Sequence, residues 1–215
     1  MTRTRIKICG FTREADVDAA FAAGADALGF VLYEKSARHV SLARAAELIA
    51  RLPPFVTPVL LFVNATADEV RAAVDTIPHA VLQFHGDEDP AACEDPGRPY
   101  IRALRMAEGV DLLDFAARFH KSQALLLDAH VEGYGGGGKV FDWSQIPPSV
   151  PLPVVLSGGL SPVNVTDGVL GVRPWAVDVS SGVEVGKGIK DAVLMRRFCQ
   201  AVRDADDRIA AGLSS

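Results

Sequence analysis

The sequence has little cysteine and little histidine, with three cysteines and five histidines among 215 residues. Cys9, Cys93 and Cys199 are odd in number and lie far apart, and no CxxC pair occurs. A disulfide framework and a zinc site are therefore both unexpected. No apolar run approaches the roughly 18 residues of a membrane span, and the early arginines are not followed by the apolar segment of a secretory signal. Together these absences favour a reduced, cytoplasmic protein with no membrane partner.

Basic residues are fewer than acidic ones, 22 against 27, which gives a net charge of −5. A nucleic-acid partner is not expected, because such proteins normally carry a basic patch. A small anion can still bind, since backbone amides or a few well-placed cations suffice to hold it. Hydrophobic residues make up 49% of the chain, which excludes a disordered protein and allows a sizeable core.

Eight short apolar runs recur along the whole chain, separated by segments long enough for a helix and its loops. These runs are Arg5–Cys9, Ala27–Leu32, Pro58–Val63, Ala80–His85, Tyr100–Arg105, Ala124–Asp128, Val154–Ser157 and Ala176–Ser180. Several are continuously apolar, which is typical of strands buried on both faces in a parallel sheet. Eight strand-then-helix units predict a single (β/α)8 TIM barrel spanning residues 1–215. The alternative is an open, doubly wound sheet of five or six strands.

Several of the intervening segments carry signals for the start of a helix. Residues that can cap a helix are Ser41, Thr66 with a capping box, Asp89 and Ser161 with Pro next in the chain, and Asp191. The sixth crossover, from Asp142, supports only a short helix. The glycine-rich segment 133–139 is too rich in glycine for regular structure, and is either a lid over the site or an idle surface loop.

In a barrel, the site lies where the strands end at their carboxyl side. Cys9 ends the first strand and is either a reactive thiol or a small buried hydrophobe. Asp128 ends the sixth strand after four apolar residues, and an apolar setting favours the protonated form of a carboxyl group. Asp128 is therefore a natural general acid.

Further polar residues follow other strands. Gln83 and His85 share one face of the fourth strand, where they either reach the barrel mouth or form a structural hydrogen-bond pair. We expect these two and Asp178 to position a substrate. Arg38, after the second strand, can form a fork onto a substrate carboxylate or be solvated at the surface.

Two loops rich in glycine and serine follow the seventh and eighth strands. Their residues are Gly158, Gly159, Ser180, Ser181 and Gly182. These are the loops that hold phosphate in phosphate-binding barrels, and free backbone amides bind phosphate without any net charge. The alternative is two ordinary tight turns.

Several motifs occur in one order along nearly the whole chain. They are Lys7-Ile8-Cys9-Gly10 with Thr12, Gly24–Phe30, Lys35–Arg38, Leu82–Gly86, Leu127-Asp128, Gly138–Trp143, Leu156–Leu160 and Val177–Glu184. With these motifs the chain closely resembles the phosphoribosylanthranilate isomerases of tryptophan biosynthesis. It departs mildly from the family pattern at Phe11, Glu34, Ala37 and Phe84, and none of these positions carries the expected chemistry.

The resemblance implies the third step of the chorismate-to-tryptophan pathway, an Amadori rearrangement of N-(5-phosphoribosyl)anthranilate by a monomer or homodimer without metal or organic cofactor. It assigns Asp128 as the general acid that opens the ribose ring and Cys9 as the general base at C2. Arg38 would hold the anthranilate carboxylate, and the seventh and eighth loops the phosphate. A thiolate base needs a helper, for which Lys7 is the nearest candidate in sequence.

Other functions remain in competition. The related isomerase of histidine biosynthesis, or an enzyme with both substrates, would be expected to carry Asp at the position of Cys9 and a second phosphate loop. A non-catalytic barrel that binds a phosphate ligand would need neither Cys9 nor Asp128. A cysteine-nucleophile hydrolase is disfavoured because no His/Asn pairing with Cys9 is evident.

Overall fold

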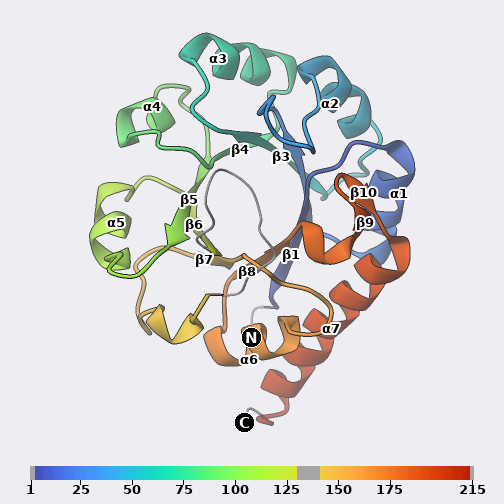
Figure 1. The fold of residues 1–215 in the computed structure, drawn as a ribbon, viewed down its shortest axis with the longest axis vertical. Coiled ribbons are helices and arrows are strands. Elements are labelled where there is room, and N and C mark those ends of the chain that lie inside the picture. The colour runs from blue at the N-terminus through green and yellow to red at the C-terminus, as the bar shows by residue number, and fades with distance from the viewer. Residues whose placement is uncertain (1–2, 130–140, 214–215) are drawn as a thin grey trace.

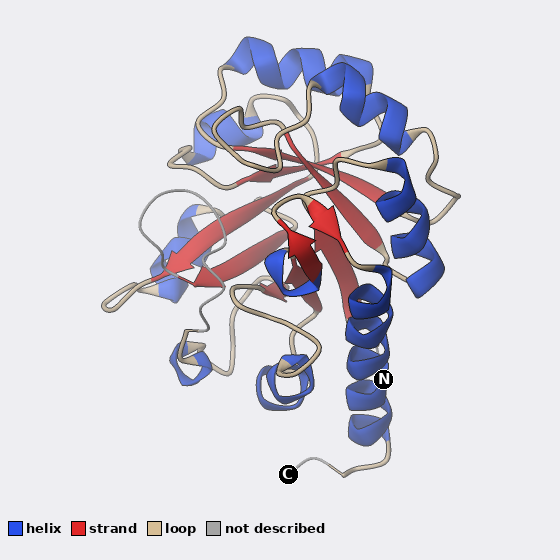
Figure 2. Ribbon diagram, turned by 45° about the vertical axis from the view of Figure 1, so that its right-hand side comes forward, coloured by secondary structure: helices blue, strands red, loops and turns tan. Residues whose placement is uncertain are grey.

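The strands predicted from the apolar runs close into a barrel. The computed structural model describes residues 3–129 and 141–213. In it the eight strands β1 to β8 pair in sequence order, and β8 pairs back to β1. Every one of these pairings is parallel, with helices outside the strands (Figures 1 and 2). The predicted (β/α)8 barrel is confirmed, and the open doubly wound sheet was wrong.

The barrel strands begin and end within one residue of the predicted bounds. They are β1 (Arg5–Cys9), β2 (Ala27–Val31), β3 (Thr57–Phe62), β4 (Val81–Phe84), β5 (Tyr100–Met106), β6 (Ala124–Ala129), β7 (Val154–Leu156) and β8 (Ala176–Val179). The helices are α1 (Glu14–Ala23), α2 (Leu42–Ile49), α3 (Ala67–Thr76), α4 (Pro90–Glu94), α5 (Leu112–Arg118), α6 (Val165–Val172) and α7 (Ala192–Ala210), with 3-10 turns η1 (Trp143–Gln145) and η2 (Ser181–Val183).

Successive residues of each strand face alternately outward and inward. The outward residues, such as Phe62 and Phe84, pack under the helices in the main core, and these two rings stack with centroids 5.8 Å apart. Inside the barrel, Leu126 and Val155 belong to a small apolar cluster. Because the same alternation continues to the ends of the strands, the polar residues there face the barrel mouth.

Most of the predicted helix starts are confirmed. The side chains of Ser41, Thr66, Asp89 and Asp191 each accept a hydrogen bond from a backbone N–H in the first turn of the following helix. The short helix after Asp142 is the 3-10 turn η1, whose Ser144 N–H donates to the Asp142 carboxylate at 3.0 Å.

The predicted helix start at Ser161 is seen in part. Ser161 Oγ accepts the Val163 N–H at 3.3 Å, and the Ser161 carbonyl accepts the Val165 N–H at 3.1 Å, as at the start of a helix. Residues 162–164 form a turn, however, and helix α6 begins only at Val165. A serine followed by proline suits the first two positions of a turn as well as a helix start.

A two-stranded antiparallel sheet follows β8 and was not predicted. It consists of β9 (Glu184–Gly186) and β10 (Ile189–Lys190), which Figure 1 shows beside the N-terminal part of the barrel. The Thr12 hydroxyl donates to the Gly188 carbonyl at 2.7 Å, and the Lys190 N–H donates to Asp16 Oδ2 at 3.0 Å. These bonds hold the hairpin against the loop that follows β1 and against the first turn of α1.

Two further predictions concern membrane spans and the glycine-rich segment. Among the helices of residues 3–129 and 141–213, none is long and apolar enough to cross a membrane. The glycine-rich segment 133–139 lies outside the described residues, so its expectation as a lid or surface loop stays a prediction.

Candidate active site

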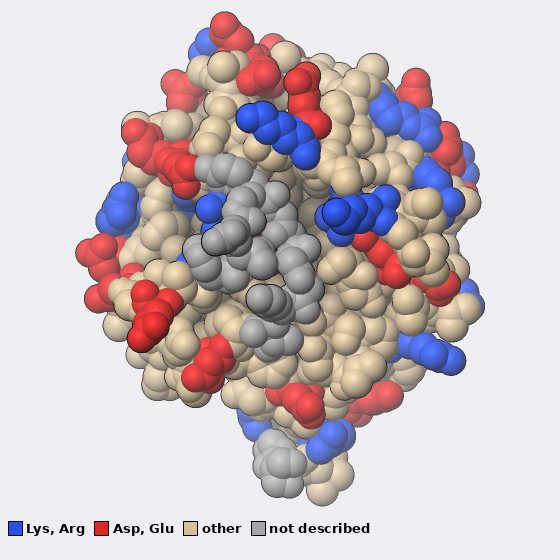
Figure 3. All heavy atoms as spheres, in the orientation of Figure 1, with Lys and Arg blue, Asp and Glu red and all other residues tan. Residues whose placement is uncertain are grey.

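The carboxyl ends of the barrel strands surround a pocket that gathers nearly all of the predicted site residues. Its lining includes Cys9, Arg38, Gln83, His85, Asp128, Gly158, Gly159, Asp178, Ser180 and Ser181. Gly182 does not line the pocket but follows Ser181 directly. Over the face of the molecule seen in Figure 3, acidic and basic side chains are interspersed. An anion in the pocket must therefore rely on local donors.

One side of the pocket is a chain of hydrogen bonds that ends on Asp128. Gln83 Nε2 lies 3.1 Å from His85 Nδ1, and His85 Nε2 lies 3.2 Å from Asp128 Oδ2. The other carboxylate oxygen, Oδ1, accepts the N–H of Ala129 at 2.9 Å. Gln83 Oε1 has no hydrogen-bond partner among the described residues, so the amide can turn over and offer His85 either a donor or an acceptor. Asp128 and His85 can therefore exchange the roles of donor and acceptor.

The other side of the pocket holds Cys9 among buried charges. Lys7 lies two residues before Cys9 on the same inward face of β1. Its ammonium donates to Asp178 Oδ1 at 2.9 Å. Burial raises the pKa of the Cys9 thiol, and the neighbouring charge of Lys7 acts against that rise. Burial alone would lower the pKa of Lys7, but Asp178 and Cys9 together hold it above its usual range. Lys7 is thus a positively charged neighbour of the Cys9 thiol.

The glycine at position 29 makes room for this thiol. A Cβ atom on Gly29 would lie 2.5 Å from Cys9 Sγ, closer than such atoms approach. In the sequence, Gly29 stands out only as part of the motif Gly24–Phe30. Its role follows from the register that pairs Cys9 with Gly29 across β1 and β2.

An apolar wall completes this part of the pocket. Val31, Leu61 and Val63, from the ends of β2 and β3, form one buried cluster with Cys9, against which Tyr33 packs. These residues were not among the predicted site residues. The sequence places these residues on the inward face of two apolar strands. Residues of an ordinary core show the same pattern, so it does not by itself indicate a binding site.

Arg38 lines the pocket, but part of its guanidinium is already occupied. Its Nε and Nη2 donate to the two carboxylate oxygens of Glu184 at 2.8 Å and 2.7 Å. Glu184 is in turn bound by Lys190, whose Nζ lies 2.7 Å from Glu184 Oε1. Glu184 and Lys190 belong to the hairpin that the sequence analysis missed, and neither was among its candidate residues.

The two predicted phosphate loops lie against each other. A Cβ atom on Gly182 would lie 1.9 Å from the Leu160 carbonyl oxygen, so only glycine allows these loops to approach so closely. The N–H groups of Gly158 and Gly159 donate to no backbone carbonyl of residues 3–129 and 141–213 outside the helices and strands. Backbone amides without such a carbonyl partner are suitable hydrogen-bond donors to an anion.

The chain is similar to known proteins along most of its length. A family model described as N-(5'-phosphoribosyl)anthranilate isomerase matches residues 6–201. The chain belongs to the N-(5'-phosphoribosyl)anthranilate isomerase family. An isomerase of that name from Leptothrix cholodnii is 72% identical over 206 residues, covering 96% of this chain and 94% of the relative. Another from Methylibium petroleiphilum is 70% identical over 209 residues, covering 97% and 98%.

Solved structures of phosphoribosylanthranilate isomerases have the same fold. The enzyme from Thermotoga maritima superposes with a TM-score of 0.87 at 38% identity, covering 94% of this chain and 99% of its own. A second solved structure, a phosphoribosylanthranilate isomerase bound to reduced 1-(o-carboxyphenylamino)-1-deoxyribulose 5-phosphate, has a TM-score of 0.83 at 35% identity with the same coverage. The resemblance to this family, predicted from the motifs, is confirmed.

Proposed function

We propose that this pocket performs the Amadori rearrangement of N-(5-phosphoribosyl)anthranilate to 1-(o-carboxyphenylamino)-1-deoxyribulose 5-phosphate. In this proposal Asp128 is the general acid and Cys9 is the general base. The observation that carries it is that Cys9 and Asp128 line one pocket, from strands β1 and β6 between which β7 and β8 lie. The names of the relatives and the bound product analogue of the second solved structure support the choice of substrate.

The first step opens the ribose ring. Asp128 donates its proton to the ring oxygen, the bond from that oxygen to C1 breaks, and the anthranilate nitrogen lone pair forms a C1=N iminium. In the hydrogen-bonded chain described above, the amide of Gln83 then presents its oxygen to His85 Nδ1–H, so that His85 Nε2 accepts from the protonated Asp128. That arrangement gives Asp128 the proton that the step consumes.

The second step removes the proton at C2. The iminium withdraws electrons, and the thiolate of Cys9 takes the proton while the C2–H electron pair forms the C1=C2 bond of an enolamine. The enolamine then gains a proton at C1 and loses one from its C2 hydroxyl to become the ketone. Lys7 supports the thiolate because it lies beside Cys9 and is held charged by Asp178. The ring C1–O bond breaks as its oxygen gains a proton from Asp128, and the proton that Cys9 takes from C2 is balanced by the one gained at C1, so substrate and product are isomers and no further reactant is needed.

The remaining residues bind the substrate. In this proposal the phosphate rests on Gly158, Gly159 and Ser180–Gly182, and Asp178 and the pair Gln83 and His85 position the ribose. The anthranilate ring lies against the apolar wall of Val31, Leu61 and Val63, and its carboxylate meets Arg38. The negative net charge does not oppose this binding, because both anionic groups meet local donors.

The experiment is a fluorescence assay of substrate consumption by the purified protein and its variants. We expect Asp128→Asn and Cys9→Ala each to lower kcat by about 1000-fold, in the range that general acid–base groups contribute. The matched controls are Asp75→Asn, on the exposed face of α3, and Cys93→Ala, a buried cysteine outside the pocket. Wild-type rates in both site variants would refute the proposed roles, and no turnover by the wild type would refute the substrate.

A further inference from the structure

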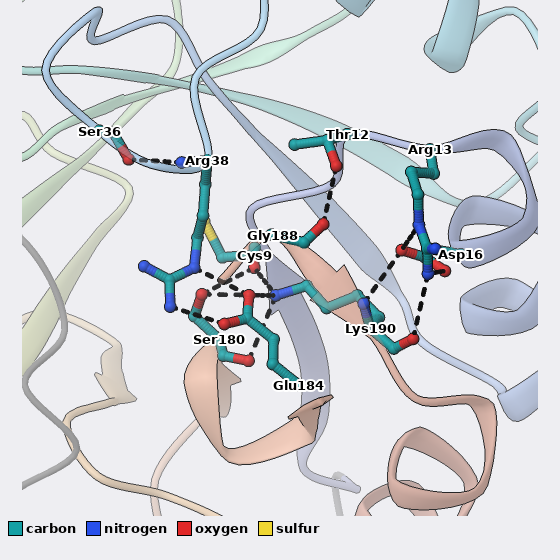
Figure 4. Close-up of polar contacts among 10 residues, drawn as sticks. All are labelled: Cys9, Thr12, Arg13, Asp16, Ser36, Arg38, Ser180, Glu184, Gly188 and Lys190. Atoms are coloured by element: carbon teal, nitrogen blue, oxygen red, sulfur yellow. Dashed lines mark hydrogen bonds and ion pairs between the residues drawn. The ribbon is translucent and has the colours of Figure 1, made fainter. Parts of the chain in front are cut away.

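The guanidinium of Arg38 has two faces that can each hold a carboxylate, and they have different surroundings. Glu184 occupies the side face, formed by Nε and Nη2. The end face, formed by Nη1 and the second N–H of Nη2, points away from Glu184 in Figure 4. No hydrogen bond joins Nη1 to the residues that the structure describes. A planar fork held on one face has its other face fixed in direction.

A second buried ion pair lies behind this one. The side chain of Lys190 is fully buried, and its Nζ donates to Glu184 Oε1 at 2.7 Å and to the Cys9 carbonyl at 2.5 Å (Figure 4). It also lies 3.2 Å from the Ser180 carbonyl oxygen. All these partners are oxygen acceptors, which suits an ammonium with three N–H donors. One cation therefore connects the ends of β1 and β8 with the acid that holds Arg38.

The charges of this group do not cancel. Burial alone would raise the pKa of Glu184, but Arg38 and Lys190 hold it below its usual range, so it is an anion at neutral pH. Within this group of three, one anion between two cations leaves a net charge of +1. Burial lowers the pKa of Lys190, and Glu184 acts against that fall. Without Lys190, Glu184 would neutralise Arg38, and little attraction would remain for an incoming carboxylate.

We infer that Glu184 and Lys190 are a positioning pair that aims the end face of Arg38 at the substrate and preserves its positive charge. The pair thereby sets the preference of the pocket for an aglycone that carries a carboxylate. This inference rests on the proposed function, in which Arg38 meets the anthranilate carboxylate. The hairpin of β9 and β10 provides the pair, because Lys190 and Glu184 are cross-strand partners in it.

The test compares two substrates with one preparation of each variant. One substrate is phosphoribosylanthranilate, and the other is its carboxamide analogue made from 2-aminobenzamide, which cannot form the charged fork. The readout is the ratio of kcat/KM for the acid to kcat/KM for the amide. A loss of folded protein lowers both values equally and leaves this ratio unchanged, so a merely structural role does not move it.

We expect Glu184→Gln and Lys190→Met each to lower this ratio about tenfold, through a higher KM for the acid, as befits a charge-assisted hydrogen bond. Arg38→Met should lower it at least as far. Asp18→Asn is the matched control, because Asp18 holds Nε and Nη2 of Arg51 in the same way on the exposed surface.

Each result decides something different. An unchanged ratio in Glu184→Gln or in Lys190→Met, together with a lowered ratio in Arg38→Met, overturns the role of that residue and leaves the proposed function intact. An unchanged ratio in Arg38→Met overturns the proposed carboxylate site, and the inference with it.

Discussion

The two rims of the pocket hold their ionisable groups in different ways. The base rim, Lys7, Cys9 and Asp178, is closed: the side chains of its ion pair are 5% and 7% exposed. The acid rim, Gln83, His85 and Asp128, is more open, with the side chains of His85 and Asp128 at 13% and 10%. Burial disfavours an anion, so a thiol that must become a thiolate needs a fixed cation beside it.

The acid rim has a different requirement. In the proposed reaction its carboxyl group delivers a proton and later regains one, which calls for a partner that can switch between donor and acceptor. Histidine has one ring nitrogen of each kind in its neutral form. The comparison teaches that one rim is organised by permanent charge and the other by exchangeable hydrogen bonds.

Among the residues that surround Cys9 and Asp128, the largest expected effect comes from removing the positive charge of Lys7 at the base rim. Lys7→Met should lower kcat about 100-fold, because the Cys9 thiolate loses its nearest cation, and it should destabilise the protein by about 3 kcal/mol, because Asp178 is left as a buried unpaired charge. Steady-state kinetics and denaturant unfolding measure the two effects.

The double variant Lys7→Met/Asp178→Asn separates these effects. Removing both charges should restore most of the stability and none of the rate. If the double variant regained wild-type activity, the fixed cation would not matter for the thiolate, and the contrast between the rims would fail.

The next effect is on the rate of cysteine alkylation, which rises about tenfold per pH unit below the pKa of the thiol. This rate should distinguish Cys9 from the other two cysteines. Burial raises the pKa of Cys93 to about 12 and that of Cys199 to about 11, and both side chains are fully buried. Alkylation requires the thiolate, whose fraction rises tenfold per pH unit below the pKa. Burial raises the pKa of the Cys9 thiol as well, with Lys7 acting against that rise, but Cys9 lines the pocket whereas Cys93 and Cys199 do not. Because a reagent can reach the pocket, we expect iodoacetamide to label Cys9 first, at a rate that rises with pH.

Mass spectrometry of the labelled protein between pH 7 and pH 9 provides the measurement. Lys7→Met should slow the labelling of Cys9 and leave Cys93 unaffected. Equal labelling rates at Cys9 and Cys93 in the folded protein would contradict the special setting of the base rim.

A comparable effect is expected at the acid rim. His85→Asn keeps a side-chain N–H donor for Asp128. An asparagine lacks the two opposite ring nitrogens through which histidine can accept a proton on one side and donate one on the other. We therefore expect kcat to fall about tenfold with KM nearly unchanged. The alkylation rate of Cys9 should stay as in the wild type. A His85→Asn enzyme with the wild-type kcat would show that Asp128 regains its proton directly from water.

The smallest expected effect is at a site remote from both rims, and it serves as a reference for the effects on stability and activity described above. Thr66→Ala removes the capping box of α3, in which Thr66 Oγ1 accepts the Glu69 N–H at 3.3 Å and the Glu69 carboxylate accepts the Thr66 N–H at 2.7 Å. The free energy of unfolding should fall by about 1 kcal/mol. Thermal melts and the fluorescence assay should show a lower Tm with an unchanged kcat, and a lower kcat would tie the helix to the chemistry.

Much of the fold and of the site follows from local patterns. Inward and outward positions alternate along a strand, so Gln83 and His85 could be placed at the mouth and Phe84 under the helices before any coordinates were known. Cys9 and Asp128 were predicted because a strand end is where such a barrel keeps its chemistry.

The features that were not predicted lie where the chain departs from the repeat of strand and helix. The hairpin of β9 and β10 contains residues that fit a loop as well as strands, and Glu184 and Lys190 look like ordinary solvated charges in the sequence. The first residue of α6 was not predicted for a similar reason, since serine followed by proline at Ser161 begins turns as well as helices.

The sequence by itself determined the period of strand and helix, the family, and which residue types stand at the strand ends. Only the tertiary structure decided which charges meet. Lys7 reaches Asp178 across 171 positions of the chain, and Arg38 reaches Glu184 across 146. Such pairs carry no local signal, because closing the barrel brings together residues whose separation along the chain says nothing about their distance in space. Burial then gives these few charges a strength that the same residues would lack in water.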